Sequence, residues 1–138
     1  MSFELVPGLA KKMDVIELET SIVKFESNYK ECPWIFVIPK IENKGNFTDL
    51  TKEQQVKLMD EVSLASDVMN EVFNPDRINV AMIGNMTPQI HVHVICRYEN
   101  DPHWPGTIWN TEKSPMTDEA AAKMIAKIKE KFEEKSGA

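Results

Sequence analysis

The chain has 138 residues, of which 42% are apolar and 28% charged, and its formal net charge is −6. This length and composition fit one globular domain with its own core, and they exclude a disordered chain. The acidic balance, without a run of Lys or Arg, argues against nucleic acid or an anionic membrane as the partner. Cys32 and Cys96 have no framework spacing and the N-terminus has no signal-peptide pattern, so we expect a cytoplasmic protein.

The first third of the chain predicts a short helix and two strands. Residues 8–14 can form the helix behind Pro7. Residues 20–25 and 34–38 are β-branched and aromatic runs, which are typical of strands. The polar stretch between them, which contains a proline, predicts a turn.

Two longer helices are predicted further along the chain. Thr51 and Gln54 form a capping-box pattern, and the helix that they start should stop before Pro75. Its apolar stripe is Leu58, Val62, Ala65, Met69 and Val72. Thr117 can cap the last helix, whose inward-facing residues are Ala121, Ile125, Ile128 and Phe132.

Between these helices, residues 78–83 and 89–97 are predicted strands. The brief connection between them indicates an antiparallel hairpin. The order strand, strand, helix, strand, strand, helix indicates an α+β fold, in which an antiparallel sheet has its helices on one face. The other face is then free to carry a site or a subunit interface.

The strand over residues 89–97 carries two of the three histidines in the chain. Alternate side chains of a strand share one face at a spacing of roughly 6.5–7 Å, so Gln89, His91 and His93 should reach one phosphate group. A neutral imidazole can attack phosphorus, a second can donate a proton, and an amide can bind phosphate oxygens. The plain alternative is an ordinary half-buried strand, which shows the same alternation.

A metal site is the rival interpretation of the same pair. Two histidines at this spacing on a strand are common metal ligands, and His103 or Asp101 can complete the shell. No third ligand has a compelling spacing, however, and Cys96 should point to the opposite face. We therefore predict no resident metal and no required cofactor.

The segment Gln89–Ile95 resembles the motif of the histidine triad (HIT) superfamily, His-φ-His-φ-His-φ-φ with φ apolar, except that the first histidine is glutamine. Further stretches match the family in order: Trp34–Lys40, Ile78–Val80 and Trp104–Gly106. The resemblance covers about residues 15–110 and is closest to a bacterial HIT-like group with Gln-φ-His-φ-His. It implies one HIT-like domain over residues 1–138, with about five strands and a C-terminal helix over about residues 117–135.

The resemblance implies a hydrolase or transferase that acts on the α-phosphate of a small nucleoside phosphate, such as a dinucleoside polyphosphate or a nucleoside phosphoramidate. His91 matches the nucleophile that becomes nucleotidylated, and His93 matches the histidine that contacts phosphate and assists the leaving group. Gln89 stands where the first histidine orients the nucleophile. A homodimer is implied as well, and a divalent cation can arrive with the nucleotide.

Other residues are candidate contacts to the nucleotide or its phosphate. Gly84 and Asn85 stand where the family has its phosphate loop, although a tight turn selects the same residues. Asn28 can bind a ribose, although strict spacing selects Glu26. Arg97 shares the face of the histidines and can neutralise phosphate, with a surface salt bridge as the plainer interpretation.

The segment after the motif, with His103, Trp104 and Trp109, can cross to a partner subunit in HIT relatives. Trp104 is therefore a further candidate contact to the nucleotide. Trp34 stands in place of an auxiliary histidine of the family, and we expect it to pack in the core, with stacking on a base as the alternative. Besides the enzyme, a nucleotide-binding module without turnover and a metal protein using His91 and His93 stay open.

Overall fold

The computed structural model describes residues 3–42 and 44–136, so the two ends of the predicted domain and Asn43 lie outside the described residues. The elements along the chain are α1 (Pro7–Ala10), β1 (Met13–Glu17), β2 (Ser21–Phe25), β3 (Trp34–Pro39), the short 3-10 helix η1 (Phe47–Asp49), α2 (Lys52–Phe73), β4 (Arg77–Ala81), β5 (Val92–Arg97) and α3 (Asp118–Ser136). The strands form one antiparallel sheet in the order β1-β2-β3-β5-β4. This architecture confirms the predicted α+β fold with an antiparallel sheet of five strands.

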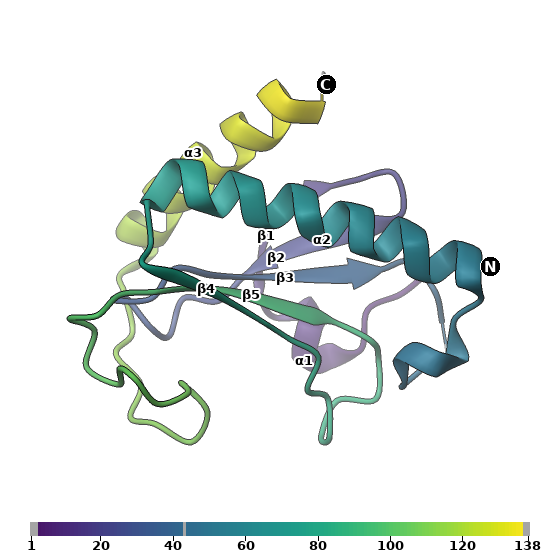
Figure 1. Ribbon diagram of the computed structural model, residues 1–138, viewed down its shortest axis with the longest axis horizontal. Helices are drawn as coiled ribbons and strands as arrows, with labels where there is room; N and C mark the ends of the chain where they lie inside the picture. Colours follow the sequence, from purple (N-terminus) through teal and green to yellow (C-terminus); the bar gives the residue numbers. More distant parts are fainter. Residues whose placement is uncertain (1–2, 43, 137–138) are drawn as a thin grey trace.

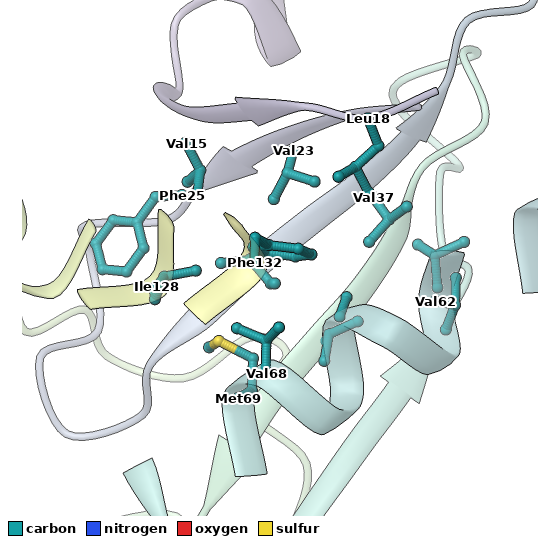
Figure 2. Close-up of a cluster of buried hydrophobic side chains, with 14 of the residues drawn as sticks. Val15, Leu18, Val23, Phe25, Val37, Val62, Val68, Met69, Ile128 and Phe132 are labelled. Carbon is teal, nitrogen blue, oxygen red and sulfur yellow. The ribbon is translucent and has the colours of Figure 1, made fainter. Parts of the chain in front are cut away.

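Helices α2 and α3 cover one face of the sheet, and α1 lies on the other face (Figure 1). The main core lies between the sheet and the two long helices, and Figure 2 shows Met69 and Val68 of α2 beside Ile128 and Phe132 of α3. Burial of these apolar side chains is the main force that holds the layers together. In the predicted stripes only Val72 and Ile125 are half-buried rather than buried. No described helix is long and apolar enough to cross a membrane.

The long helices begin at the residues that the sequence predicts. In the capping box of α2, Thr51 Oγ1 accepts from the Gln54 amide at 3.1 Å, and Gln54 Oε1 accepts from the Thr51 amide at 2.9 Å. This helix ends at Asn74, which adopts the left-handed conformation with φ 46° that asparagine tolerates well. Thr117 caps α3 by accepting from the Ala120 amide at 3.1 Å.

The first strand, β1, is absent from the sequence prediction. Residues 8–14 were expected to be helical, but α1 ends at Ala10 and residues 13–17 pair with β2 instead. The register of this pair shifts between Asp14 and Ile16. Such a bulge inserts an extra residue and disturbs the period-two alternation by which a strand is detected in sequence.

Strands β3 and β5 lie inside the sheet, as β2 does, and every residue of β3 and β5 is buried. The pairing of β4 with β5 confirms the predicted antiparallel arrangement, with Ala81 opposite His93. The two strands are shorter than predicted, so their connection spans residues 82–91 and is no tight hairpin. Because β5 is an inner strand, His93 lies in the middle of the sheet face opposite α2 and α3.

Candidate active site

We call the sheet face opposite α2 and α3 the histidine face. Its buried apolar residues come from β3, β5, α1 and two loops: Leu9, Tyr29, Cys32, Trp34, Phe36, Ile38, Ile95 and Ile108. The rings of His91 and His93 lie on this face with centroids 4.8 Å apart and planes at 73°. The structure thus brings the two histidines together as predicted, although only 5% of each is exposed.

The His91 ring has a defined orientation and tautomer. Its Nδ1 lies 2.7 Å from the backbone carbonyl oxygen of Gln89. A carbonyl oxygen only accepts hydrogen bonds, so Nδ1 must carry the proton and donate it. In the neutral ring, Nε2 then carries the free lone pair, which is the state that a nucleophile requires.

Gly84 lies directly against this ring. A Cβ atom at residue 84 would approach Cε1 of His91 to 3.2 Å and the backbone oxygen of Thr87 to 2.7 Å. The same turn is closed by a hydrogen bond from the Thr87 amide to the Gly84 carbonyl at 3.1 Å. Gly84 is therefore required for the close approach of the turn to the His91 ring, and its contact with phosphate stays a prediction. Asn85 is exposed on the same turn.

The His93 ring, in contrast, uses both of its nitrogens within the chain. The indole Nε1–H of Trp34 donates to Nδ1 at 3.1 Å, which leaves the ring proton on Nε2. Nε2 in turn donates to the Ile83 carbonyl at 3.2 Å. Burial lowers the pKa of His93 from 6.5 to about 4 and outweighs the hydrogen bond to the Ile83 carbonyl, which raises it; His91 and Lys12 add smaller contributions that lower the pKa further. His93 is therefore neutral at physiological pH.

Aromatic rings surround the two imidazoles. Trp109 stands edge-on to His93 at a centroid distance of 4.7 Å, and Phe36 lies 5.1 Å from the same ring. Trp34 is 4% exposed, which confirms core packing, and its hydrogen bond to His93 adds a role that the sequence did not indicate. Trp109 packs on a histidine of its own chain, so in this structure it forms part of the wall of the site.

Two hollows border the histidine pair. One, of about 460 Å³, lies between β4 and residues 105–109 and reaches Trp109. The other, of about 630 Å³, is lined by residues 4–6, Glu42, Gly45, Pro88 and Gln89. The first touches the ring that packs on His93, and the second touches the residue whose carbonyl holds His91. Neither hollow is lined by His91 or His93, so each adjoins a neighbour of the pair and not the rings themselves.

Arg97 does not reach the surface. It is 2% exposed, and its Nε and Nη2 donate to the two oxygens of Asp101 at 2.9 and 3.2 Å. Its Nη1 donates to Asn79 Oδ1 at 3.1 Å. The expected phosphate contact or surface salt bridge is therefore replaced by a buried ion pair. The ring of Trp104 lies 6.0 Å from the Arg97 guanidinium, so in this chain Trp104 packs on the ion pair.

Asp101 anchors the segment that follows β5. Besides Arg97, the backbone amides of Tyr98 and His103 donate to it at 3.1 and 2.9 Å. Burial alone raises the pKa of this carboxyl, but the hydrogen bonds from Arg97 and the two amides outweigh burial and hold the pKa well below its usual range. The segment that Asp101 anchors carries Trp109. The ion pair therefore helps to hold Trp109 against His93 without touching either ring.

Comparison with known proteins gives the family. The sequence matches the HIT domain family over residues 11–100, most of the chain. The chain belongs to the HIT domain family. This is a superfamily of nucleotide-binding proteins and hydrolases.

Solved structures of HIT proteins share the whole fold. A histidine triad protein of Marinobacter aquaeolei is 35% identical, with a TM-score of 0.88 and coverage of 97% of this chain and 98% of its own. Those of Bradyrhizobium japonicum and Sinorhizobium meliloti are each 28% identical, with TM-scores of 0.90 and 0.88. They cover 96% and 94% of this chain and 99% and 96% of their own. No curated protein shows a significant match to the chain.

Gln89 holds the place of the first triad histidine of a HIT protein, but its amide contacts the N-terminal segment. The Val6 amide donates to Oε1 at 3.0 Å, and Nε2 donates to the Glu4 carbonyl at 3.1 Å. Only the backbone carbonyl of Gln89 contacts a histidine. Residues 89–91 precede β5, and for this reason the strict alternation expected from residue 89 onward does not apply to the Gln89 side chain.

Asn28, the candidate ribose contact, donates to the carboxylate of Glu26 at 2.8 Å. Glu26 is the alternative ribose contact from the sequence, so the two candidates lie side by side. Glu26 also accepts from Lys12 at 2.7 Å. Lys12 lies 5.7 Å from the Phe36 ring, so it places a positive charge near the histidine face. No sequence motif predicts this position of Lys12, because it depends on how α1 packs across the sheet.

Metal ligation finds little support in this geometry. Among residues 3–42 and 44–136, no three side chains of His, Cys, Asp or Glu form a group that could hold an ion. Asp101 is paired with Arg97, and Cys96 lies in the core under the long helices. Both ring nitrogens of His93 already have partners. His91 and His93 therefore lack the further ligands that the metal interpretation requires.

Proposed function

We propose that this protein is a nucleotidyl hydrolase or transferase that acts on the α-phosphate of a small nucleoside phosphate, with His91 as the nucleophile. The observation that carries the proposal is the 2.7 Å hydrogen bond from His91 Nδ1 to the Gln89 carbonyl. It leaves the Nε2 lone pair free in the neutral ring.

In the proposed reaction, the Nε2 lone pair of His91 attacks the α-phosphorus and a P–N bond forms. The bond between phosphorus and the leaving group breaks, and the leaving group departs with the electron pair and takes a proton from water. The imidazole becomes cationic, and the Gln89 carbonyl that accepts from Nδ1 stabilises this charge. Water or a second phosphate then attacks phosphorus, the P–N bond breaks, and the neutral imidazole returns.

His93 supports this reaction in its neutral form. Its Nε2–H is a proton donor on the ring next to the nucleophile, and the Ile83 carbonyl now accepts it. A phosphate or leaving-group oxygen that displaces this carbonyl would accept the same hydrogen bond. We keep Gly84 and Asn85 as phosphate contacts and Asn28 as a ribose contact, whereas Arg97 and Trp104 are left out because they serve the buried ion pair. The reaction needs no resident metal, and a divalent cation would enter with the nucleotide.

The test is a panel of labelled adenylylated and guanylylated compounds, which includes dinucleoside polyphosphates and phosphoramidates. We expect wild-type protein to release a nucleoside monophosphate and to carry an acid-labile label on His91 after quenching. The His91→Gln variant should lose both, by at least a thousandfold in rate, because no other residue supplies the nucleophile. Full activity of this variant would refute the proposal, and His103→Gln is the matched control.

A second candidate is a nucleotide-binding module without turnover. The observation that favours it is the burial of both imidazoles, which are 5% exposed, and the engagement of both His93 nitrogens. Calorimetry separates the two candidates. Micromolar binding of a nucleotide with neither label on His91 nor product release would support the module and exclude the enzyme.

We also propose that the protein is a cytoplasmic homodimer that associates along the β4 edge. Among the described large apolar residues, Val80, Met82 and Ile83 near this edge are 50%, 37% and 42% exposed. Edge strands with exposed apolar side chains are ready sites for pairing. Light scattering should give twice the monomer mass, and Val80→Lys should give a monomer.

A further inference from the structure

The Gln89 side chain forms a two-point clamp on the N-terminal segment, residues 3–12. It accepts from the Val6 amide at 3.0 Å and donates to the Glu4 carbonyl at 3.1 Å. The acceptor and the donor of the Gln89 side-chain amide are thus both used, by backbone groups two residues apart. Gln89 is 6% exposed, so an unmade hydrogen bond of its amide would be costly.

A second buried side chain holds the other end of the segment. Lys24 is 5% exposed, and its Nζ donates to the carbonyl of Ala10 at 3.5 Å and to that of Lys12 at 3.2 Å. Between the two clamps, Leu9 is 3% exposed in the core of the histidine face. The segment is therefore attached at both ends and packed in the middle, across the face that carries His91 and His93.

The segment reaches the site at two points. A Cβ atom on Gly8 would lie 3.8 Å from Thr87 Oγ1, so α1 lies next to the turn that holds Gly84 against His91. At the end of the segment, Lys12 lies 5.7 Å from the Phe36 ring, and Phe36 packs on His93. A change in how the segment docks would be transmitted to both histidines.

We propose that the Gln89 side chain is a positioning residue that acts on the reaction through the N-terminal segment and does not bind phosphate. Its amide holds residues 4–6, and these keep α1 and Lys12 against the histidine face. In this chain, then, the residue at the first position of the triad does not contact the substrate. Its side chain fixes the N-terminal segment, which packs against the site. The inference rests on the proposed function for its effect on rate, but the clamp itself can be tested without any substrate.

The first test measures hydrogen exchange of the Val6 amide by NMR. In Gln89→Leu, which removes both bonds, we expect this amide to exchange about tenfold faster or more, because its acceptor is lost. Gln89→Met is a second variant should the leucine fail to fold. The matched control is Gln55→Leu, which removes a glutamine that bonds the carbonyls of Phe47 and Leu50 and not those of the segment. Unchanged exchange at Val6 in the folded Gln89 variants would overturn the clamp.

The second test is a double-mutant cycle on kcat/KM with Val6→Pro. Val6 has φ −64°, which proline adopts without strain, so this change keeps the backbone angle and removes the N–H that donates to Gln89. If Gln89 acts through the segment, Gln89→Leu and Val6→Pro each lower kcat/KM, and the double variant is no worse than the more impaired single variant. Independent, multiplicative losses would show that Gln89 contacts the substrate itself and would overturn the inference.

Gln89→Glu adds a test of sign. A carboxylate still accepts from the Val6 amide, so a positioning role predicts more activity than in Gln89→Leu. A phosphate ligand predicts the reverse, because the carboxylate repels phosphate. If wild-type protein cleaves no nucleotide, the proposed function fails, whereas Val6 exchange still decides whether the clamp exists.

Discussion

The indole N–H of Trp34 donates to Nδ1 of His93 at 3.1 Å. Indole nitrogen is only a donor, so this bond defines which nitrogen of His93 carries the proton and points Nε2–H towards Ile83. A residue that replaces a family histidine has thus become a positioning residue for another histidine.

Trp34→Phe should release His93 from its single tautomer. The phenyl ring fills most of the space but leaves Nδ1 of His93 without a donor, which costs about 1–3 kcal/mol in the free energy of unfolding. Proton–nitrogen NMR of the imidazole should show one tautomer in wild type and a mixture in the variant. A single unchanged tautomer in Trp34→Phe would mean that the indole is not what orients His93.

The low pKa of His93 predicts a loss of stability in acid. The folded pKa is about 4 and the ordinary value is 6.5, so the unfolded chain takes up the proton first as pH falls. Stability that is fully present above about pH 6.5 should decline towards pH 4, by roughly 3 kcal/mol for this residue. Denaturant unfolding across this range should show a flatter profile in His93→Gln than in wild type. His103→Gln, which removes a histidine outside the pair, should keep the wild-type slope.

The buried pair Arg97–Asp101 should be far more important for stability than an exposed pair of the same spacing. Asp101→Asn removes one charge and leaves the Arg97 guanidinium buried, which should lower the free energy of unfolding by about 3–5 kcal/mol. The Trp109 fluorescence should change too, since Asp101 anchors its segment. Glu119→Gln breaks the exposed i,i+4 pair with Lys123 and should leave stability unchanged within error. Equal effects of the two changes would contradict this assignment.

Gly84→Ala should impair activity more than stability. The added methyl group would lie 2.7 Å from a backbone oxygen and 3.2 Å from the His91 ring, so the turn or the ring must move. We expect kcat to fall at least tenfold, because a nucleophile displaced by a few tenths of an ångström is misaligned. Gly8→Ala is the matched control, since its methyl group would meet Thr87 at an ordinary 3.8 Å. Normal turnover by Gly84→Ala would show that the close approach is not needed.

Much of the fold could be predicted because its signals are local. The cap at Thr51, the apolar stripes of α2 and α3 and the alternation in β5 depend on neighbours in sequence and on the periods of helix and strand. The strand β1 could not, because its bulge between Asp14 and Ile16 breaks the pattern. The histidine pair was predicted for the same reason as β5, since residues two apart on a strand share a face.

The sequence by itself determined the α+β class, the capped helices and the meeting of His91 with His93. Only the tertiary structure decided what surrounds that pair: the indole bond to His93, the burial of Arg97 with Asp101, and the attachment of the Gln89 amide to residues 4–6. These contacts join residues from separate elements, Gln89 and Val6 being 83 positions apart. Local periodicity encodes which face a side chain takes, whereas its hydrogen-bond partner depends on the path of the whole chain and on the need to satisfy every polar group that burial removes from water.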